Sequence, residues 1–257
     1  MELTILGAHN CESDKARLTC LLIDRIIAID AGGLTSTLSI DDQRRLKAVL
    51  ITHHHFDHIR DLATLGMNIY TMGPLVVYAL KNTLEVISTY ILNGTLYPDL
   101  TKKPSLDKPV FKFNPVELNK DFVIGGYTVT PFAVNHGLPA VGYQITSPDG
   151  KCLIFTGDTC RNPALTWKGR SPQLIVTEVT VSNAYETIAR ESRHLTPQLL
   201  KEELIDFKKA NGYIPPVAVV HISPHLENEI RQEIARVADE LGTKITCGHE
   251  GMRITVQ

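Results

Sequence analysis

The sequence lacks the features that mark membrane, secreted or disulfide-bonded proteins. No apolar run approaches the roughly 20 residues that a bilayer-spanning helix requires, so we predict no membrane segment. The start, MELTILGAHN, has neither the basic residues nor the apolar stretch of a signal peptide. The five cysteines are widely spaced and form no CxxC pair. This usage argues against a disulfide framework and a thiolate zinc site, and it predicts a cytoplasmic protein.

An excess of charge of one sign is missing as well. The 26 basic residues are balanced by 28 acidic ones, for a net charge of −2, so an extended nucleic-acid-binding face is not predicted, although a local basic patch would fit. A chain of 257 residues with 43% hydrophobic content can bury a sizeable core. We find no internal repeat and no low-complexity linker, and we predict one domain over residues 1–257.

Short β-like runs alternate with a smaller number of amphipathic stretches, which predicts an α/β fold with four layers in the order αββα. The runs expected as strands are Leu3–Leu6, Leu18–Ile23, Ile26–Asp30, Ala48–Ile51, Leu75–Tyr78, Phe122–Ile124, Tyr127–Ala133, Gly142–Thr146, Cys152–Thr156, Leu174–Thr177, Val217–His221, Lys244–Thr246 and Met252–Val256. The segments expected as helices are Asp41–Leu46, Asp57–Leu65, Lys81–Leu92, Thr196–Ala210 and Leu226–Leu241.

The segment VLITHHHFDHIRD, from Val49 to Asp61, concentrates polar ligand-type side chains directly after an apolar run. A chance polar loop is one interpretation, and a metal site is the other. Neutral imidazoles and a carboxylate are ligands of zinc, iron and manganese. Two histidines two positions apart, His53 and His55, can point the same way toward one ion, and the pair Asp57 and His58 can face a second. The intervening His54 breaks this alternation and is not expected to be a ligand.

This H-x-H-x-D-H pattern resembles the first metal motif of the metallo-β-lactamase superfamily. The resemblance implies further ligands in FAVNHG, LIFTGDT and VAVVHIS. Taken alone, each has a structural interpretation instead: a loop histidine in the first stretch, a capping aspartate in the second and a structural histidine in the third. It implies one ion held by His53, His55 and His136, a second held by Asp57, His58 and His221, and Asp158 between them. Two divalent ions, with Zn²⁺ favoured over Mn²⁺ or Fe²⁺, would hold a bridging hydroxide as the nucleophile.

The stretch TEVTVSNAYETIARESRHLTPQLLKEEL, which begins at Thr177, resembles the ribonuclease Z branch and its class II cyclic-nucleotide phosphodiesterase relatives. The resemblance implies that His194 is the general acid that protonates a departing alkoxide and that Glu178 orients it. Asp57 completes the catalytic set that we predict. The alternative is that His194 merely precedes the helix start at Thr196-Pro197.

The predicted substrate is a small phosphodiester, such as a 3′,5′-cyclic nucleotide. His136 and Asp158 are only 22 positions apart, which leaves no room for the long tRNA-binding arm that ribonuclease Z usually carries there. A ribonuclease Z-like endonuclease without the arm, a lactonase or thioesterase of the same fold, and a non-catalytic metal-binding sensor remain alternatives. Because relatives are often dimers, a homodimer is also possible.

Two further features invite a functional interpretation. Trp167, the single tryptophan, lies beside Arg161, Lys168 and Arg170, so it could stack on a base while a basic neighbour holds a phosphate; a packed aromatic is the alternative. Near the end of the chain, His249-Glu250 stands where relatives often have an Asp-Gly pair, and His249 could be an additional pocket residue.

Overall fold

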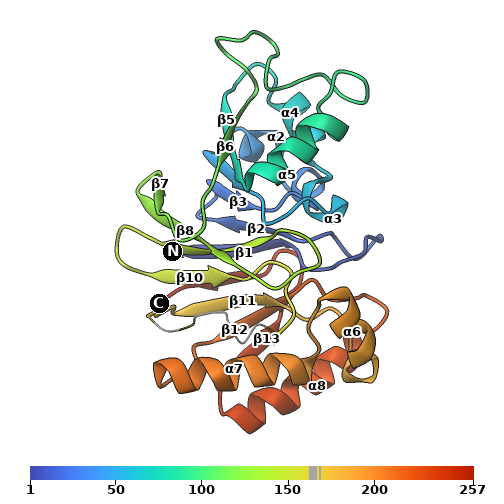
Figure 1. Cartoon of the computed structure of the whole chain (residues 1–257), viewed down its shortest axis with the longest axis vertical. Coiled ribbons are helices and arrows are strands. Elements are labelled where there is room, and N and C mark those ends of the chain that lie inside the picture. The colour runs from blue at the N-terminus through green and yellow to red at the C-terminus, as the bar shows by residue number, and fades with distance from the viewer. Residues whose placement is uncertain (162–166, 168) are drawn as a thin grey trace.

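Two seven-stranded β-sheets pack face to face in the computed structural model, and helices cover both outer faces (Figure 1). The structure describes residues 1–161, 167 and 169–257. The predicted αββα sandwich is therefore confirmed. That residues 1–257 form a single domain stays a prediction. No helix among the described residues is both long enough and apolar enough to cross a bilayer.

The first sheet contains the first strands of the chain and the last one. Its order is β14 (Arg253–Thr255), β1 (Glu2–Gly7), β2 (Cys20–Ile23), β3 (Ile27–Ile29), β4 (Ala48–Leu50), β5 (Leu75–Ala79) and β6 (Phe111–Pro115). Strands β3 to β6 run parallel. The helical segments of this half are α1 (Leu34–Thr37), α2 (Ile40–Gln43), α3 (Phe56–Ile59), α4 (Leu62–Asn68), α5 (Lys81–Val86) and the π-helix η1 (Ile87–Ile91).

The second sheet has the order β13 (Ile245–Cys247), β12 (Val217–Val220), β11 (Leu174–Glu178), β10 (Cys152–Phe155), β9 (Val141–Thr146), β8 (Tyr127–Ala133) and β7 (Phe122–Ile124). Strands β10 to β13 run parallel, and β9 is antiparallel to both β10 and β8. Strand β8 therefore points in the same direction as β10, β11 and β12. The helical segments here are the 3₁₀-helix η2 (Asn183–Tyr185), α6 (Glu186–Ser192), α7 (Pro197–Asn211) and α8 (Glu227–Leu241).

The central core lies between the two sheets. Strands such as β2 and β12 are buried along their whole length, which explains why they read as unbroken apolar runs rather than as alternating ones. Tyr143 of β9 is fully buried there, and its hydroxyl donates a hydrogen bond of 2.9 Å to the carbonyl of Ile51 at the end of β4. This bond ties the second sheet to the loop that follows β4.

Several elements differ from those predicted, in addition to the short helices α1 and η2, which were not predicted. Strand β6 was missed because it is an edge strand with mainly exposed or half-buried residues and a proline at its end. Helix α6 is short and has one fully buried residue, Ala189, so its apolar periodicity is weak. The helix predicted over Asp57–Leu65 is divided into α3 and α4, and the one predicted over Lys81–Leu92 continues into η1.

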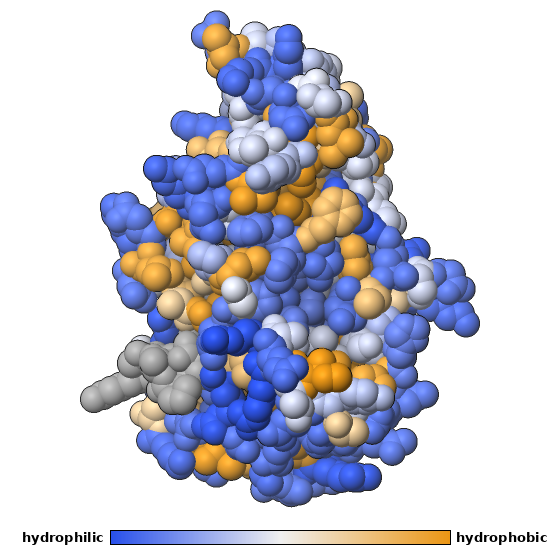
Figure 2. Space-filling model, turned by 45° about the vertical axis from the view of Figure 1, so that its right-hand side comes forward, coloured by the Kyte–Doolittle hydropathy of each residue, from blue (hydrophilic) through white to orange (hydrophobic). Residues whose placement is uncertain are grey.

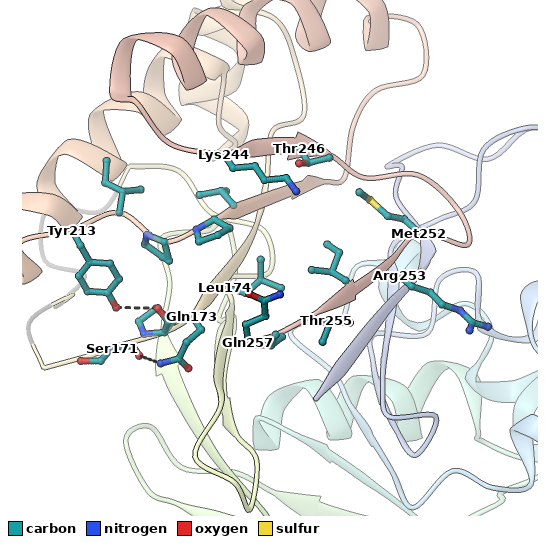
Figure 3. A pocket seen from close by; sticks show the side chains of 17 residues that line it. Ser171, Gln173, Leu174, Tyr213, Lys244, Thr246, Met252, Arg253, Thr255 and Gln257 are labelled. Atoms are coloured by element: carbon teal, nitrogen blue, oxygen red, sulfur yellow. Dashed lines mark hydrogen bonds between the residues drawn. The ribbon is translucent and has the colours of Figure 1, made fainter.

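The surface is mostly hydrophilic on the face shown in Figure 2, with apolar side chains gathered in its upper part, on the half that carries the first sheet. Large apolar side chains exposed in this half include Tyr90, Leu96 and Leu106. A cavity of about 900 Å³ opens beside the edge strands β13 and β14 (Figure 3). Its lining includes Tyr213 and Lys244 but none of the predicted site residues.

Candidate metal centre

The predicted metal ligands lie just beyond the ends of strands of both sheets, in loops or, for Asp57 and His58, in the short helix α3. The segment from His53 to His58 follows β4 in the first sheet. The other three ligands follow β8, β10 and β12, which point the same way in the second sheet. Because their carboxyl ends share one edge, His136, Asp158 and His221 reach the same place. The structure brings all seven predicted ligands together in two adjoining groups.

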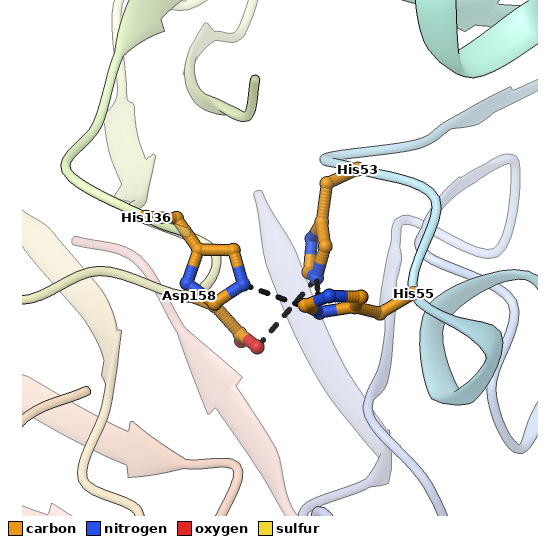
Figure 4. A group of neighbouring side chains, drawn as sticks. All are labelled: His53, His55, His136 and Asp158. Atoms are coloured by element: carbon orange, nitrogen blue, oxygen red, sulfur yellow. Dashed lines mark hydrogen bonds and ion pairs between the residues drawn. The ribbon is translucent and has the colours of Figure 1, made fainter. Parts of the chain in front are cut away.

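The first group contains His53, His55, His136 and Asp158 (Figure 4). His55 Nδ1 lies 3.1 Å from His53 Nε2 and 3.2 Å from His136 Nε2, and Asp158 Oδ2 lies 3.7 Å from His53 Nε2. Each of these ring nitrogens carries a lone pair when it is not protonated, and His55 Nδ1 faces both of the others. A cation at their centre would satisfy all of them at once.

The second group contains Asp57, His58 and His221, and Asp158 adjoins it. Asp158 Oδ2 is 3.3 Å from His58 Nε2 and 3.3 Å from His221 Nε2, and His221 Nε2 is 3.2 Å from Asp57 Oδ2. Two buried atoms here lack a well-directed hydrogen bond: Asp158 Oδ1, and His58 Nε2, which has carboxylate oxygens only at 3.3 and 3.4 Å. Such orphaned polar atoms are costly in a protein interior. The donor set and its unsatisfied atoms therefore fit divalent metal ions.

The electrostatics of the first group match the protonation states that a metal requires. Burial lowers the pKa of His53, His55 and His136, which favours the neutral imidazole. Burial alone would raise the pKa of Asp158, but the neighbouring histidines His221 and His58 outweigh it and hold that pKa well below its usual range. Neutral imidazoles beside an ionised carboxylate are the species that coordinate metals. In the second group burial favours neutral His58, but the carboxylates of Asp158 and Asp30 outweigh it and raise the pKa of His58, so that this imidazole would release a proton on metal binding.

Three residues that support the ligands were not predicted from the sequence. Asp30, which follows β3 and is fully buried, accepts hydrogen bonds from His58 Nδ1 at 2.8 Å and from the Thr52 N–H at 2.8 Å. The Thr52 hydroxyl donates to Asp30 and lies 2.9 Å from His53 Nδ1. With Nδ1 held in this way, the Nε2 atoms of both histidines are presented to the centre, which is how outer carboxylates orient ligands.

The third supporting residue, Thr180, connects the metal groups to the predicted catalytic pair. Its hydroxyl donates to Glu178 Oε2 at 2.7 Å and lies 2.8 Å from His221 Nδ1.

Asp30 and His221 both have positive φ angles, 59° and 58°, which are uncommon for residues with a side chain. In the sequence, Asp30 could have been noticed as an acidic residue at the end of an apolar strand. The residues that it contacts, however, depend on the order of the strands in the sheet.

The predicted pair of Glu178 and His194 is formed. Glu178 is buried at the end of β11, and its Oε1 accepts from His194 Nδ1 at 2.7 Å and from the Thr159 N–H at 2.8 Å. Burial favours neutral His194, but the Glu178 carboxylate outweighs it and raises the pKa of His194 to about 9. His194 also lies in one group with Asp158 and His221, with one ligand-type atom of each within 4.8 Å of the others. The alternative of a histidine that only precedes α7 does not account for this pairing.

The stacking hypothesis for Trp167 is wrong. The indole is buried, packs edge-on against Phe207 of α7 with ring centroids 5.3 Å apart, and has its Nε1 3.4 Å from Glu203 Oε2. A ring enclosed in this way cannot stack on a base, so the packed alternative holds. Arg161 is paired with acidic residues of α7, and Lys168 lies outside the described residues. His54 belongs to neither metal group.

The His249-Glu250 departure has a structural explanation for Glu250. Its Oε1 lies 2.7 Å from Nδ1 of the buried His9 and accepts from the Arg17 N–H at 2.8 Å. The backbone next to His9 pairs with Ile222, the residue after His221. Glu250 thus anchors the loop that lies behind His221, whereas His249 is exposed and faces its neighbour's carbonyl.

This anchor should make stability depend on pH. Burial raises the pKa of Glu250, but the hydrogen bonds outweigh it and lower that pKa to about 2, and Glu250 in turn raises the pKa of His9 against burial. The Glu250 contribution is lost as the pH falls below about 4.5, and the His9 contribution is lost as the pH rises through its raised pKa.

Glu250→Gln should therefore reduce the free energy of unfolding most between about pH 4.5 and 6.5, by about 2 kcal/mol after allowance for partial exposure. Urea denaturation at several pH values measures this, with His249→Gln as the control; an equal loss at pH 5.5 and pH 9 would contradict it.

Comparisons with known proteins place the fold and the family. A family model described as a beta-lactamase superfamily domain matches residues 21–247. The 3′,5′-cyclic-nucleotide phosphodiesterase 1 of Saccharomyces cerevisiae is 33% identical over 123 residues, which cover 42% of this chain and 32% of that protein. Ribonuclease Z of Thermococcus onnurineus is 32% identical over 137 residues, which cover 50% of this chain and 40% of that protein.

The match thus spans less than half the length of each of these two curated relatives. A solved structure covers nearly the whole chain: the metallo-beta-lactamase fold protein YhfI from Bacillus subtilis superposes with a TM-score of 0.80 at 16% identity, over 99% of each chain. At that identity the likeness concerns the fold. The family match over most of the sequence and this shared architecture together show that the chain belongs to the beta-lactamase superfamily, with the metallo-β-lactamase fold.

Proposed function

We propose that the protein is a metal-dependent phosphodiesterase that acts on a small phosphodiester, such as a 3′,5′-cyclic nucleotide. The observation that carries the proposal is the Glu178–His194 pair, with Nδ1 of the imidazole held at 2.7 Å by a buried carboxylate. Because Nδ1 faces Glu178, the opposite ring nitrogen, Nε2, is left to exchange a proton with a substrate. A held histidine beside a metal centre is suited to an alkoxide leaving group, which must be protonated as it departs.

The metal ligands in this proposal are those predicted from the sequence. Two divalent ions, Zn²⁺ in the first instance, would be held by His53, His55 and His136 on one side, by Asp57, His58 and His221 on the other, and by Asp158 between them. When bound, such ions acidify water and stabilise negative charge that develops on a phosphoryl group. Asp30 and Thr52 keep the ligand nitrogens oriented, and Glu178 keeps His194 oriented.

Two observations favour a small substrate over tRNA. The interval between His136 and Asp158 is taken up by strands β9 and β10 and the tight turn that joins them, so an arm for an extended nucleic acid is missing from this interval, all of which the structure describes. The similarity to a yeast protein named as a cyclic-nucleotide phosphodiesterase supports the same substrate class.

The proposal is tested by turnover and metal content measured on the same purified samples. We expect about two equivalents of metal and hydrolysis of bis(p-nitrophenyl) phosphate and of 3′,5′-cyclic AMP, both abolished by a chelator and restored by added metal. A fully metallated protein that hydrolyses a lactone or thioester but neither phosphodiester would refute it. Metallated protein without any turnover would favour a sensor.

A ribonuclease Z-like endonuclease is the second candidate, because of the similarity to the protein named ribonuclease Z in Thermococcus onnurineus. Cleavage of a tRNA precursor at its 3′ end, at a rate above that for cyclic AMP, would favour it.

The cysteines in the described chain are all unpaired, which supports the proposed cytoplasmic location. A homodimer stays a prediction that light scattering can check.

A further inference from the structure

Arg193 stands at the rim of the metal centre in a conformation that costs free energy. It ends helix α6 with φ 62° and ψ 49°, in the left-handed region. Helices commonly end with a residue in this conformation, but glycine usually takes the position because it has no Cβ to clash. An arginine here gains nothing for the backbone, so the side chain is where a reason for it can be sought.

The position of Arg193 joins the two parts of the candidate site. Its carbonyl lies 3.3 Å from Nδ1 of His136, a predicted metal ligand, and the next residue is His194. Its guanidinium donates from Nη1 to Oδ1 of Asn135, the residue before His136. Both ends of Arg193 are thus held against the loop that carries His136.

The charge of Arg193 is not neutralised within the described part of the chain. The side chain is exposed, and no carboxylate there lies within ion-pair distance of it. Arg190, three positions earlier on the same helix, is by contrast paired with Glu186 at 2.8 Å. An arginine guanidinium has five N–H donors in a planar fork that matches two oxygens of a phosphate, and the contact with Asn135 occupies only part of it.

We infer that Arg193 binds a non-reacting oxygen of an anionic phosphodiester and so selects this substrate class over neutral lactones and thioesters. The inference rests on the proposed function and narrows it. A neutral ester offers no anionic oxygen to the fork, whereas a phosphodiester keeps a negative charge throughout the reaction. Arg193 would therefore act mainly on the binding of substrate, and His194 on the departure of the leaving group.

The test separates binding from catalysis and from folding. Diethyl phosphate, a diester with a poor leaving group, is titrated calorimetrically into the metal-loaded protein, and thermal unfolding is recorded on the same samples. We expect Arg193→Gly to weaken binding about tenfold and Arg193→Lys about threefold, because lysine keeps the charge but loses the fork. Arg193→Gly should be at least as stable as the native protein, since glycine relieves the strained cap. Arg190→Ala is the control and should bind normally.

Each result has one meaning. Unchanged affinity of Arg193→Gly for diethyl phosphate overturns the inference. A variant that loses stability and loses affinity equally for diethyl phosphate and for the neutral ester p-nitrophenyl acetate overturns it as well. Native protein that binds diethyl phosphate through Arg193 yet hydrolyses no phosphodiester would leave the inference standing and refute the proposed function. Native protein without affinity for the diester refutes the inference, and hydrolysis of phosphodiesters then decides the proposed function separately.

Discussion

Replacing Asp158 by asparagine should lower hydrolysis of bis(p-nitrophenyl) phosphate by at least about 10³-fold, because a charge shared by both metal groups is removed. Asp158 lies in contact with His53 in one group and with His58 and His221 in the other. An amide keeps the size of the side chain but cannot supply an anionic oxygen to two cations. Metal content should fall from about two equivalents to one or fewer, as measured by mass spectrometry of the purified protein.

The matched control for Asp158→Asn is His54→Ala. His54 lies between two predicted ligands in the sequence but belongs to neither group, so the variant should keep both its metal and its activity. An Asp158→Asn protein that holds two ions and turns over substrate at the native rate would refute the bridging role. Equal losses in the two variants would point to general disruption of the site rather than to a specific role of Asp158.

The second large effect is expected for His194→Ala, and its size should depend on the leaving group. With cyclic AMP the departing alkoxide needs a proton, so kcat should fall by about 10²–10⁴-fold. With bis(p-nitrophenyl) phosphate the departing phenolate is stable without a proton, so the loss should be much smaller. Glu178→Gln should also reduce kcat more for cyclic AMP than for bis(p-nitrophenyl) phosphate, because Glu178 holds the His194 ring.

Metal content distinguishes a general acid from a metal ligand at His194. The residue lies in one group with Asp158 and His221, so it could also serve as a ligand. A His194→Ala protein with full metal content and a loss confined to alkoxide substrates fits a general acid. A protein that loses metal, or equal losses for both substrates, would contradict that role.

The sequence was most informative where the site depends on short spacing. His53 and His55 lie in the loop after β4, and Asp57 and His58 follow at once in the first turn of α3, so their order alone predicts a shared metal site. His136, Asp158 and His221 are remote in sequence and were reached through a family resemblance, and the parallel direction of β8, β10 and β12 explains why they meet.

What could not be predicted depends on which strands are neighbours. Asp30 contacts Thr52 and His58 because β3 pairs with β4, and nothing in the local sequence states that pairing. The Trp167 hypothesis failed for a related reason: its basic neighbours in the sequence suggested a surface, whereas packing against Phe207 of α7 buries the ring. Strand β6 has too little buried surface to show a clear apolar pattern.

The origin of the ligands has a consequence for how the protein can be altered. One sheet supplies His53, His55, Asp57 and His58, and the other supplies His136, Asp158 and His221. The distance between the two halves of the site is therefore fixed by side chains that fill the space between the sheets, Tyr143 among them. Displacements of about 1 Å are enough to impair catalysis greatly. With the proposed function, the rate of hydrolysis should therefore depend on how the interior packs, and variants selected for altered turnover should include substitutions deep in the sandwich that touch neither metal nor substrate.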